Sequence, residues 1–116
     1  MSNSQSSLTP AMFNVLLALA DGDKHGYAIL KEVAEHTAGE VQLSTGTLYG
    51  IIKRLLEDGL IVEVTSRPSI PGDDRRRRYY RLTGEGRTVA VEEARRMEKL
   101  LDRARSKRLI RALKRA

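Results

Sequence analysis

The sequence predicts a mainly α-helical fold with a small two-stranded β-hairpin, which places it in the α+β class. Apolar residues recur at helical spacing in four segments of the chain. Two short runs rich in β-branched and aromatic residues flank a loop that contains two prolines and a glycine. A length of 116 residues with 41% hydrophobic residues suits one domain with an ordinary core. We therefore expect three helices, a hairpin and a final helix.

The first helix is predicted to begin at Thr9 and Pro10. Threonine caps free N–H groups, and proline is favoured at the first helical position because that position needs no donor. Residues of one helical face then follow, and the helix should end before Asp21. This apolar face consists of Met12, Val15, Leu16 and Leu19.

The next two helices are predicted over 25–37 and 45–58. Ala38 and Gly39 end the first of them, whereas Ser44 caps the second and Gly59 stops it. The inward faces follow helical spacing. In 25–37 this face is Tyr27, Leu30, Val33 and Ala34, and in 45–58 it is Leu48, Ile51, Ile52, Leu55 and Leu56.

Two strands are predicted over 60–65 and 78–82. The intervening stretch 67–74 holds two prolines and a glycine, which suits a hairpin loop. Tyr80 and Leu82 alternate onto one face of the second strand, so we expect Tyr80 in the core.

Thr83 is predicted to cap a last helix that runs from about residue 85 toward the C-terminus. Small and apolar residues recur on it at spacings of 4, 3, 4 and 3, the pattern of two packed helices. A helix about 40 to 48 Å long cannot bury this stripe on one small body, so we expect a second copy of the chain to cover it. A solvated basic tail after about residue 104 is the alternative for the last dozen residues. The seam residues are Ala90, Ala94, Met97, Leu101 and Ala104, and the next position would be Arg108.

The net charge of +6 is unevenly distributed. Residues 67–81 carry +4 and residues 95–116 carry +8, while 1–66 carry −4 and 82–94 carry −2. Net charge alone does not choose among nucleic acid, an anionic membrane and solvent. The longest apolar run is too short to cross a membrane, the start of the chain lacks a secretory pattern, and cysteine is absent. We therefore expect a cytoplasmic protein that has no membrane partner.

Enzyme chemistry is not expected. The two histidines, His25 and His36, are three helical turns apart and no metal-ligand spacing surrounds them. No phosphate-binding glycine loop occurs. The sequence therefore indicates no catalytic residue, no metal and no cofactor.

The second and third helices, joined by a short turn, have the pattern of a helix-turn-helix, and the hairpin makes it winged. Small polar residues at the start of the third helix allow close approach to a DNA major groove, where side chains contact base edges. Lys53 lies a turn further along, where it can meet a phosphate. For Ser44 and Thr47 alone, helix capping is an equal alternative. The predicted groove-facing set is Ser44, Thr45, Gly46, Thr47, Tyr49 and Lys53.

Four consecutive arginines stand at the base of the β-wing. Guanidinium groups bind phosphate oxygens in pairs, and these arginines lie beside the predicted reading helix. A solvated charged surface is the alternative for such a run, but its position favours nucleic acid. The residues are Arg75, Arg76, Arg77 and Arg78.

Five ordered motifs over residues 8–87 resemble the PadR family of prokaryotic transcriptional regulators. They are LTP (8–10), HGYAI (25–29), LSTGTLY (43–49), IKRLLEDGLI (52–61) and RYYRLT (78–83), followed by Gly86 and Arg87. The resemblance implies a homodimeric winged helix-turn-helix repressor that binds double-stranded operator DNA and is often released by a small ligand. One C-terminal helix implies the short subfamily, in which that helix and the first helix form the dimer.

The resemblance supports the groove-facing set and the arginines as DNA contacts. It also places His25 and Gly26 at the start of the second helix, where N–H groups can hold a phosphate; close helix packing is the alternative role for Gly26. Tyr27 shares a face with Leu30 and Ala34, so the core is favoured for it over a DNA contact. Met12 and Phe13 join the seam residues in the predicted dimer interface, for which ordinary packing is favoured over a ligand pocket. The chain has no tryptophan and one phenylalanine, so no effector is indicated.

The predicted organisation is a disordered tail over 1–7, a winged helix-turn-helix DNA-binding domain over 8–83 and a C-terminal dimerisation helix with a basic end over 84–116. The expected function is sequence-specific transcriptional regulation, most simply as a repressor near its own or adjacent genes. The two alternatives are a winged-helix protein-interaction module and a nonspecific nucleic-acid-binding protein.

Overall fold

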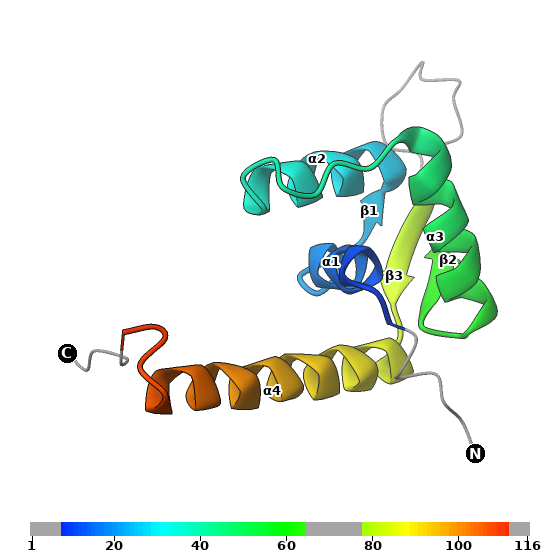
Figure 1. Ribbon diagram of the computed structural model, residues 1–116. Helices are drawn as coiled ribbons and strands as arrows, with labels where there is room; N and C mark the ends of the chain where they lie inside the picture. The colour runs from blue at the N-terminus through cyan, green and yellow to red at the C-terminus, as the bar shows by residue number, and fades with distance from the viewer. Residues whose placement is uncertain (1–7, 65–77, 112–116) are drawn as a thin grey trace.

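A computed structural model describes residues 8–64 and 78–111, and this part of the chain forms four helices and a small antiparallel sheet (Figure 1). The predicted class, mainly α with a small β-wing, is confirmed. The predicted tail 1–7 and the predicted hairpin loop 67–74 lie outside the described residues. The elements in chain order are α1 (Pro10–Ala18), β1 (Lys24–His25), α2 (Gly26–His36), α3 (Thr45–Glu57), β2 (Ile61–Val64), β3 (Tyr79–Leu82) and α4 (Gly84–Ser106).

Three helices begin at the hydroxyl caps that the sequence predicts. The side chain of Thr9 accepts a hydrogen bond from the Met12 N–H at 3.1 Å, at the start of α1. Thr83 accepts from the Gly86 N–H at 2.9 Å and so caps α4. Ser44 caps α3 in the same way. These local bonds satisfy donors that every helix start leaves free, which is why the starts are readable from sequence.

The sheet has three strands in the order β1-β3-β2, so the prediction of a two-stranded wing was incomplete. β3 pairs antiparallel with β2, where Ile61 lies opposite Leu82, and with β1, where Lys24 lies opposite Tyr80. A two-residue strand is too short to show an alternating pattern. Its place is set by pairing with β3, 54 residues further along the chain, where His25 lies opposite Tyr79.

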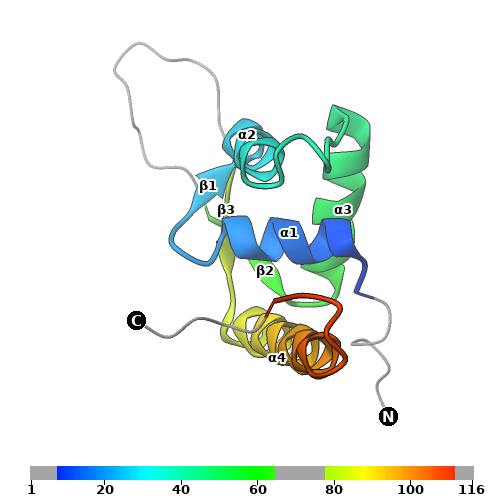
Figure 2. The ribbon, with the colours of Figure 1, turned by 60° about the vertical axis from the view of Figure 1, so that its left-hand side comes forward.

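The core is shared by the first three helices and the sheet. In Figure 2, α1 lies between α2 and α4, with the sheet and α3 beside it. Tyr80 is in this core, as predicted, and burial raises the pKa of its hydroxyl. The buried cluster consists of Met12, Val15, Leu16, Ala18, Leu19, Ile29, Val33, Leu48, Ile52, Leu55, Leu60, Ile61 and Tyr80.

Tyr27 is not in the core, and that prediction was wrong. Its side chain is 67% exposed, whereas Ile29 and Val33 of the same helix are buried. The buried residues of α2 are Gly26, Ile29 and Val33, so Val33 was predicted correctly and the first turn of the predicted face was one residue out of phase. The apolar residues of this segment fit helical spacing in two ways that differ by one residue, and the prediction took the one that includes Tyr27.

The last helix is shorter than predicted. α4 has 23 residues, about 35 Å, and ends at Ser106 rather than continuing toward the C-terminus. Arg108 takes a left-handed φ of 64°, and the Leu109 N–H donates to the Ala104 carbonyl at 2.9 Å, which closes the helix end. The helix therefore stops where its apolar seam would have reached Arg108. Within the described residues this agrees with the alternative of a non-helical basic end.

α4 is joined to the segment just before β2 by contacts at its first turn. The Thr83 hydroxyl donates to the Gly59 carbonyl at 2.8 Å, and the Thr83 N–H donates to the Leu60 carbonyl at 3.1 Å. A Cβ on Gly86 would overlap that same Leu60 carbonyl group. The direction in which α4 leaves the winged domain is thus set by a glycine that allows two backbone segments to touch.

Candidate nucleic-acid interface

The structure places the six predicted groove-facing residues at the cap of α3 and on the exposed part of its surface. Each of them is exposed, while Leu48, Ile52 and Leu55 on the opposite face are buried. α3 lies at the edge of the molecule in Figure 1, so this face is turned away from the core. The face spans Ser44, Thr45, Gly46, Thr47, Tyr49 and Lys53.

The residues at the start of this face are glycine or carry small hydroxyl side chains. Ser44 accepts from the Thr47 N–H at 3.0 Å and donates to the Thr47 hydroxyl at 2.9 Å, so the Ser44 hydroxyl serves as a helix cap. No heavy atom comes within 4 Å of a Cβ built on Gly46 or Gly50. A helix with this surface admits close approach of a large polar ligand, as DNA recognition requires.

Tyr49 is held in place by Gly26. A Cβ on Gly26 would overlap the Tyr49 hydroxyl and lie 2.9 Å from its Cζ, so the ring occupies the space that a larger residue would fill. Tyr49 stays 46% exposed in this position. Gly26, which was predicted as a backbone phosphate contact, is itself buried. Its observed role is to let α2 and α3 approach, with the tyrosine between them.

His25 also serves the local structure. Its Nδ1 accepts from the Ala28 N–H at 3.3 Å and caps α2. Its ring meets Tyr79 of β3 edge to face, with centroids 5.4 Å apart. The imidazole thus occupies one of the N–H groups that were predicted to hold a phosphate. Tyr27 adjoins this position and is exposed, although the sequence interpretation favoured the core for it.

Several basic groups near the sheet are engaged within the chain. Arg81 donates two hydrogen bonds to Asp23, both at 3.0 Å, and these bonds raise the pKa of its guanidinium group. A hydrogen bond from Lys24 lowers the pKa of Asp21. The Asp21–Lys24 pair lies within the segment between α1 and α2, and the Asp23–Arg81 pair joins that segment to β3. They leave these cations less available to a ligand.

The basic residues of the predicted interface differ in availability. Lys53 is exposed and has no salt bridge within the described part of the chain. Arg78 is exposed but lies 3.7 Å from the carboxylate of Glu63 on β2. Arg75, Arg76 and Arg77 lie outside the described residues. Over 8–64 and 78–111, no group of three His, Asp or Glu is placed to hold a metal, and no helix is long and apolar enough to cross a membrane.

The predicted dimer residues fall into two groups. Met12, at 7% exposure, is part of the core of a single chain, so little of it remains for a partner. Phe13 is also covered within the chain, beside α4. Ala90, Met97 and Ala104 are half-buried, whereas Ala94 and Leu101 are exposed. Three of these five seam residues are therefore partly covered within their own chain, and the other two are exposed.

Comparison with known proteins places this arrangement in a family. Residues 15–92 match the family described as the transcriptional regulator PadR-like family. Transcriptional regulator Rv3488 of Mycobacterium tuberculosis is 37% identical over 87 residues, which cover 75% of each chain. A PadR family transcription regulator from Clostridium difficile superposes with a TM-score of 0.70 at 28% identity, over 88% of this chain and all of the other. The fold is also that of Bacillus subtilis PadR in complex with operator DNA, with a TM-score of 0.65 at 22% identity over 75% of this chain and 48% of the other.

Proposed function

The chain belongs to the PadR-like family of transcriptional regulators, and from that premise we propose that it is a homodimeric repressor that binds a pseudo-palindromic operator. The observation that carries the proposal is the exposed face of α3, which begins with small residues and has open space around Gly46 and Gly50 in the described chain. Members of this family are non-enzymatic DNA-binding regulators, in agreement with the prediction that the chain is not an enzyme.

In the proposed complex, the first half of α3 enters the major groove. Thr45, Thr47 and Tyr49 are the side chains that reach base edges, because they are exposed and stand around the open backbone of Gly46. Lys53, one turn further, contacts a phosphate. Ser44 acts through its cap, which orients the N-terminal N–H groups of α3 toward the backbone of the duplex.

The wing arginines provide the electrostatic part of binding. Arg75, Arg76 and Arg77 directly precede Arg78 and β3 in the sequence, and β2 of the same sheet contacts α3. Phosphate contacts of this kind add affinity without sequence preference, and they weaken as the salt concentration rises because counterion release then contributes less. The exposed Tyr27 at the start of α2 adds a further contact to the sugar-phosphate backbone.

The dimer sets the spacing of the two reading helices. Two copies related by a two-fold axis would place their α3 helices in successive major grooves, with half-sites about 34 Å apart. α1 and α4 form the proposed interface, with Phe13, Ala94 and Leu101 as the residues beside the open side of the seam. Release by a small ligand remains an expectation from the family resemblance, and no effector is proposed.

Removing the four wing arginines is expected to weaken binding to every duplex. Replacing Arg75, Arg76, Arg77 and Arg78 with alanine should lower affinity for operator and random DNA by similar factors. The slope of log affinity against log salt should flatten by about 0.9 for each phosphate that the variant no longer neutralises. Titrations at several salt concentrations measure both quantities. A weakening confined to the operator would show that these arginines read sequence instead.

Gly26→Ala is expected to reduce the preference for operator over random DNA about as much as Tyr49→Ala does. The added methyl group displaces the Tyr49 ring, and because this ring is partly exposed it can swing aside while the fold remains. The cost should be about 1 to 3 kcal/mol of discrimination, which is the usual value of one good side-chain interaction with a base. Competition titrations measure it, with circular dichroism to confirm folding.

Tyr49→Phe is the matched control for this pair, since it keeps the ring and removes only the hydroxyl. If Gly26→Ala leaves discrimination unchanged while Tyr49→Ala reduces it, the glycine does not position the tyrosine. If neither variant has an effect, α3 is not the reading helix.

A further inference from the structure

One face of α4 carries a row of four cations in the C-terminal half of the helix. Arg96, Lys99, Arg103 and Lys107 follow one another at spacings of three, four and four residues, so they share a face of the helix and its C-cap. All four residues are exposed. The row is about 17 Å long, at 1.5 Å per residue. We call these four residues the α4 basic stripe.

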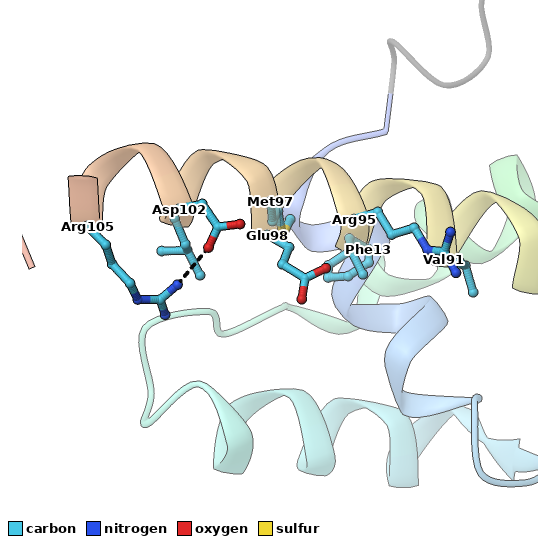
Figure 3. Close-up of a pocket in the computed structure, with 9 residues that line it drawn as sticks. Phe13, Val91, Arg95, Met97, Glu98, Asp102 and Arg105 are labelled. Carbon is cyan, nitrogen blue, oxygen red and sulfur yellow. Dashed lines mark hydrogen bonds and ion pairs between the residues drawn. The ribbon is translucent and has the colours of Figure 1, made fainter. Parts of the chain in front are cut away.

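The carboxylates of this part of the chain lie elsewhere on the helix. Glu98 and Asp102 are the only acidic residues after position 94. Both line a groove on the open side of α4, which Figure 3 shows together with the ion pair between Asp102 and Arg105. No residue of the α4 basic stripe lines this groove. The stripe is therefore a surface of a single charge.

Three of the four cations have no partner within the part of the chain that the structure describes. Arg96 donates to Glu93 at 3.1 Å, but no salt bridge or side-chain hydrogen bond engages Lys99, Arg103 or Lys107 over 8–64 and 78–111. Basic residues beside the sheet are instead held by aspartates of their own chain. Like charges four residues apart on a helix repel each other. A bound polyanion would relieve this repulsion.

The stripe lies on the side of the molecule away from the start of α3. In Figures 1 and 2, α3 begins beside α2, whereas α4 runs along the far side of α1 from α2. The body of the domain thus separates Thr45 and Tyr49 from α4. In Figure 1 the C-terminal half of α4 also extends past this body. A straight duplex in contact with the start of α3 therefore leaves the stripe free.

We propose that the α4 basic stripe binds the sugar-phosphate backbone of a second DNA duplex, so that a molecule bound to its operator bridges two segments of DNA. This inference goes beyond the proposed function, which places a single duplex on α3 and the wing. Along one strand of DNA a phosphate recurs about every 3.4 Å, so the stripe spans about five phosphates. Two stripes facing each other would repel, so the proposed homodimer leaves them on its outer surface.

The residues around the stripe favour DNA over an anionic membrane. A helix that lies on a membrane surface inserts a broad apolar face beside its cations. Among the exposed large apolar residues of α4, Val91 and Leu101 line the groove, which leaves Leu100 as the one that adjoins the stripe. A single leucine is not such a face. Contacts to phosphates need only the exposed cations, and the arginines can bind phosphate oxygens in pairs.

Capture of a second duplex tests the proposal in the full chain. A biotinylated promoter fragment is immobilised, saturated with protein and washed, and a fluorescent random duplex is then added at about 0.05 M salt. The unaltered protein should capture this second duplex. The triple variant Lys99→Gln, Arg103→Gln and Lys107→Gln should capture it about tenfold less or weaker still, and the slope of log affinity against log salt should fall by about 2 to 3. Glutamine has a helix propensity similar to those of lysine and arginine, and circular dichroism checks folding.

Lys99→Arg with Lys107→Arg is the matched control, because it changes two of the same positions and keeps their charge. This variant should capture the second duplex as the unaltered protein does. The triple variant should bind the promoter fragment within about threefold of the unaltered protein, since the stripe lies away from that duplex.

The proposal is overturned if the unaltered protein captures no second duplex, or if the triple variant captures it equally well. An equal loss of promoter binding and of capture also overturns it, because the stripe would then contact the operator itself. So does binding to vesicles of equal parts phosphatidylserine and phosphatidylcholine without capture of DNA, which would assign the stripe to a membrane. A promoter fragment bound no more tightly than random DNA contradicts only the proposed function, because capture of the second duplex needs no sequence preference.

Discussion

Gly86→Ala is expected to lower the free energy of unfolding by about 2 to 3 kcal/mol, which corresponds to a fall in melting temperature of about 10 °C. The new methyl group would collide with the Leu60 carbonyl, which is backbone directly before β2, and would come within 2.9 Å of a Leu82 methyl group. Neither a strand nor a hydrogen-bonded carbonyl moves as readily as a side-chain tip. Thermal and urea unfolding measure the effect.

Gly84→Ala is the matched control for this prediction, because it lies two residues earlier in the same helical turn and nothing comes within 4 Å of its added Cβ. It should leave stability unchanged or raise it by up to about 1 kcal/mol, the ordinary gain of alanine over glycine in a helix. Equal stability of the two alanine variants would show that α4 does not pack against Leu60 as described.

Leu101→Glu is expected to produce a folded monomer and to reduce operator affinity about 100-fold or more. The substitution places two carboxylates at the centre of the proposed interface, where two exposed leucines would otherwise pack together. A monomer binds each half-site independently and loses the gain in affinity that comes from linking two sites. Light scattering gives the mass, and titration of operator DNA gives the affinity.

Leu100→Glu provides the comparison for the same change of charge. Leu100 is as exposed as Leu101, at 48% against 46%, but it does not line the groove that Phe13, Ala94 and Leu101 line on the open side of α4. This variant should remain dimeric and bind operator normally. If both glutamate variants dissociate equally, the interface covers a wider part of α4 than the groove; if neither does, the interface lies elsewhere.

The parts of the structure that the sequence predicts well are those with local causes. α3 begins at Ser44 and its buried and exposed faces follow helical spacing, so the face that carries Thr45 and Tyr49 follows from the amino-acid sequence alone. The hydroxyls of Thr9 and Thr83 accept hydrogen bonds from N–H groups only three residues further along, so these helix starts also follow from the amino-acid sequence. The exposure of the groove-facing residues was therefore predictable, whereas their contact with DNA stays a prediction.

The parts that were missed depend on distant contacts. β1 exists because Lys24 and His25 pair with β3 more than fifty residues later. The Gly26–Tyr49 and Gly86–Leu60 contacts likewise join separate elements, and a glycine in a sequence does not reveal what it lies against. The phase of α2 was misjudged at Tyr27 because two apolar faces one residue apart compete in that segment. The end of α4 had a visible signal, since its seam fails at Arg108.

The central claim is that the exposed face of α3 reads a specific DNA sequence, and one titration tests it most directly. The unaltered protein is titrated, by fluorescence anisotropy at about 0.15 M salt, with the promoter fragment of its own gene and with a random duplex of equal length. The proposed function predicts at least about a thousandfold preference for the promoter fragment. Equal affinity for the two duplexes would contradict it and indicate a nonspecific nucleic-acid-binding protein, and no binding to either at low salt would indicate a protein-interaction module.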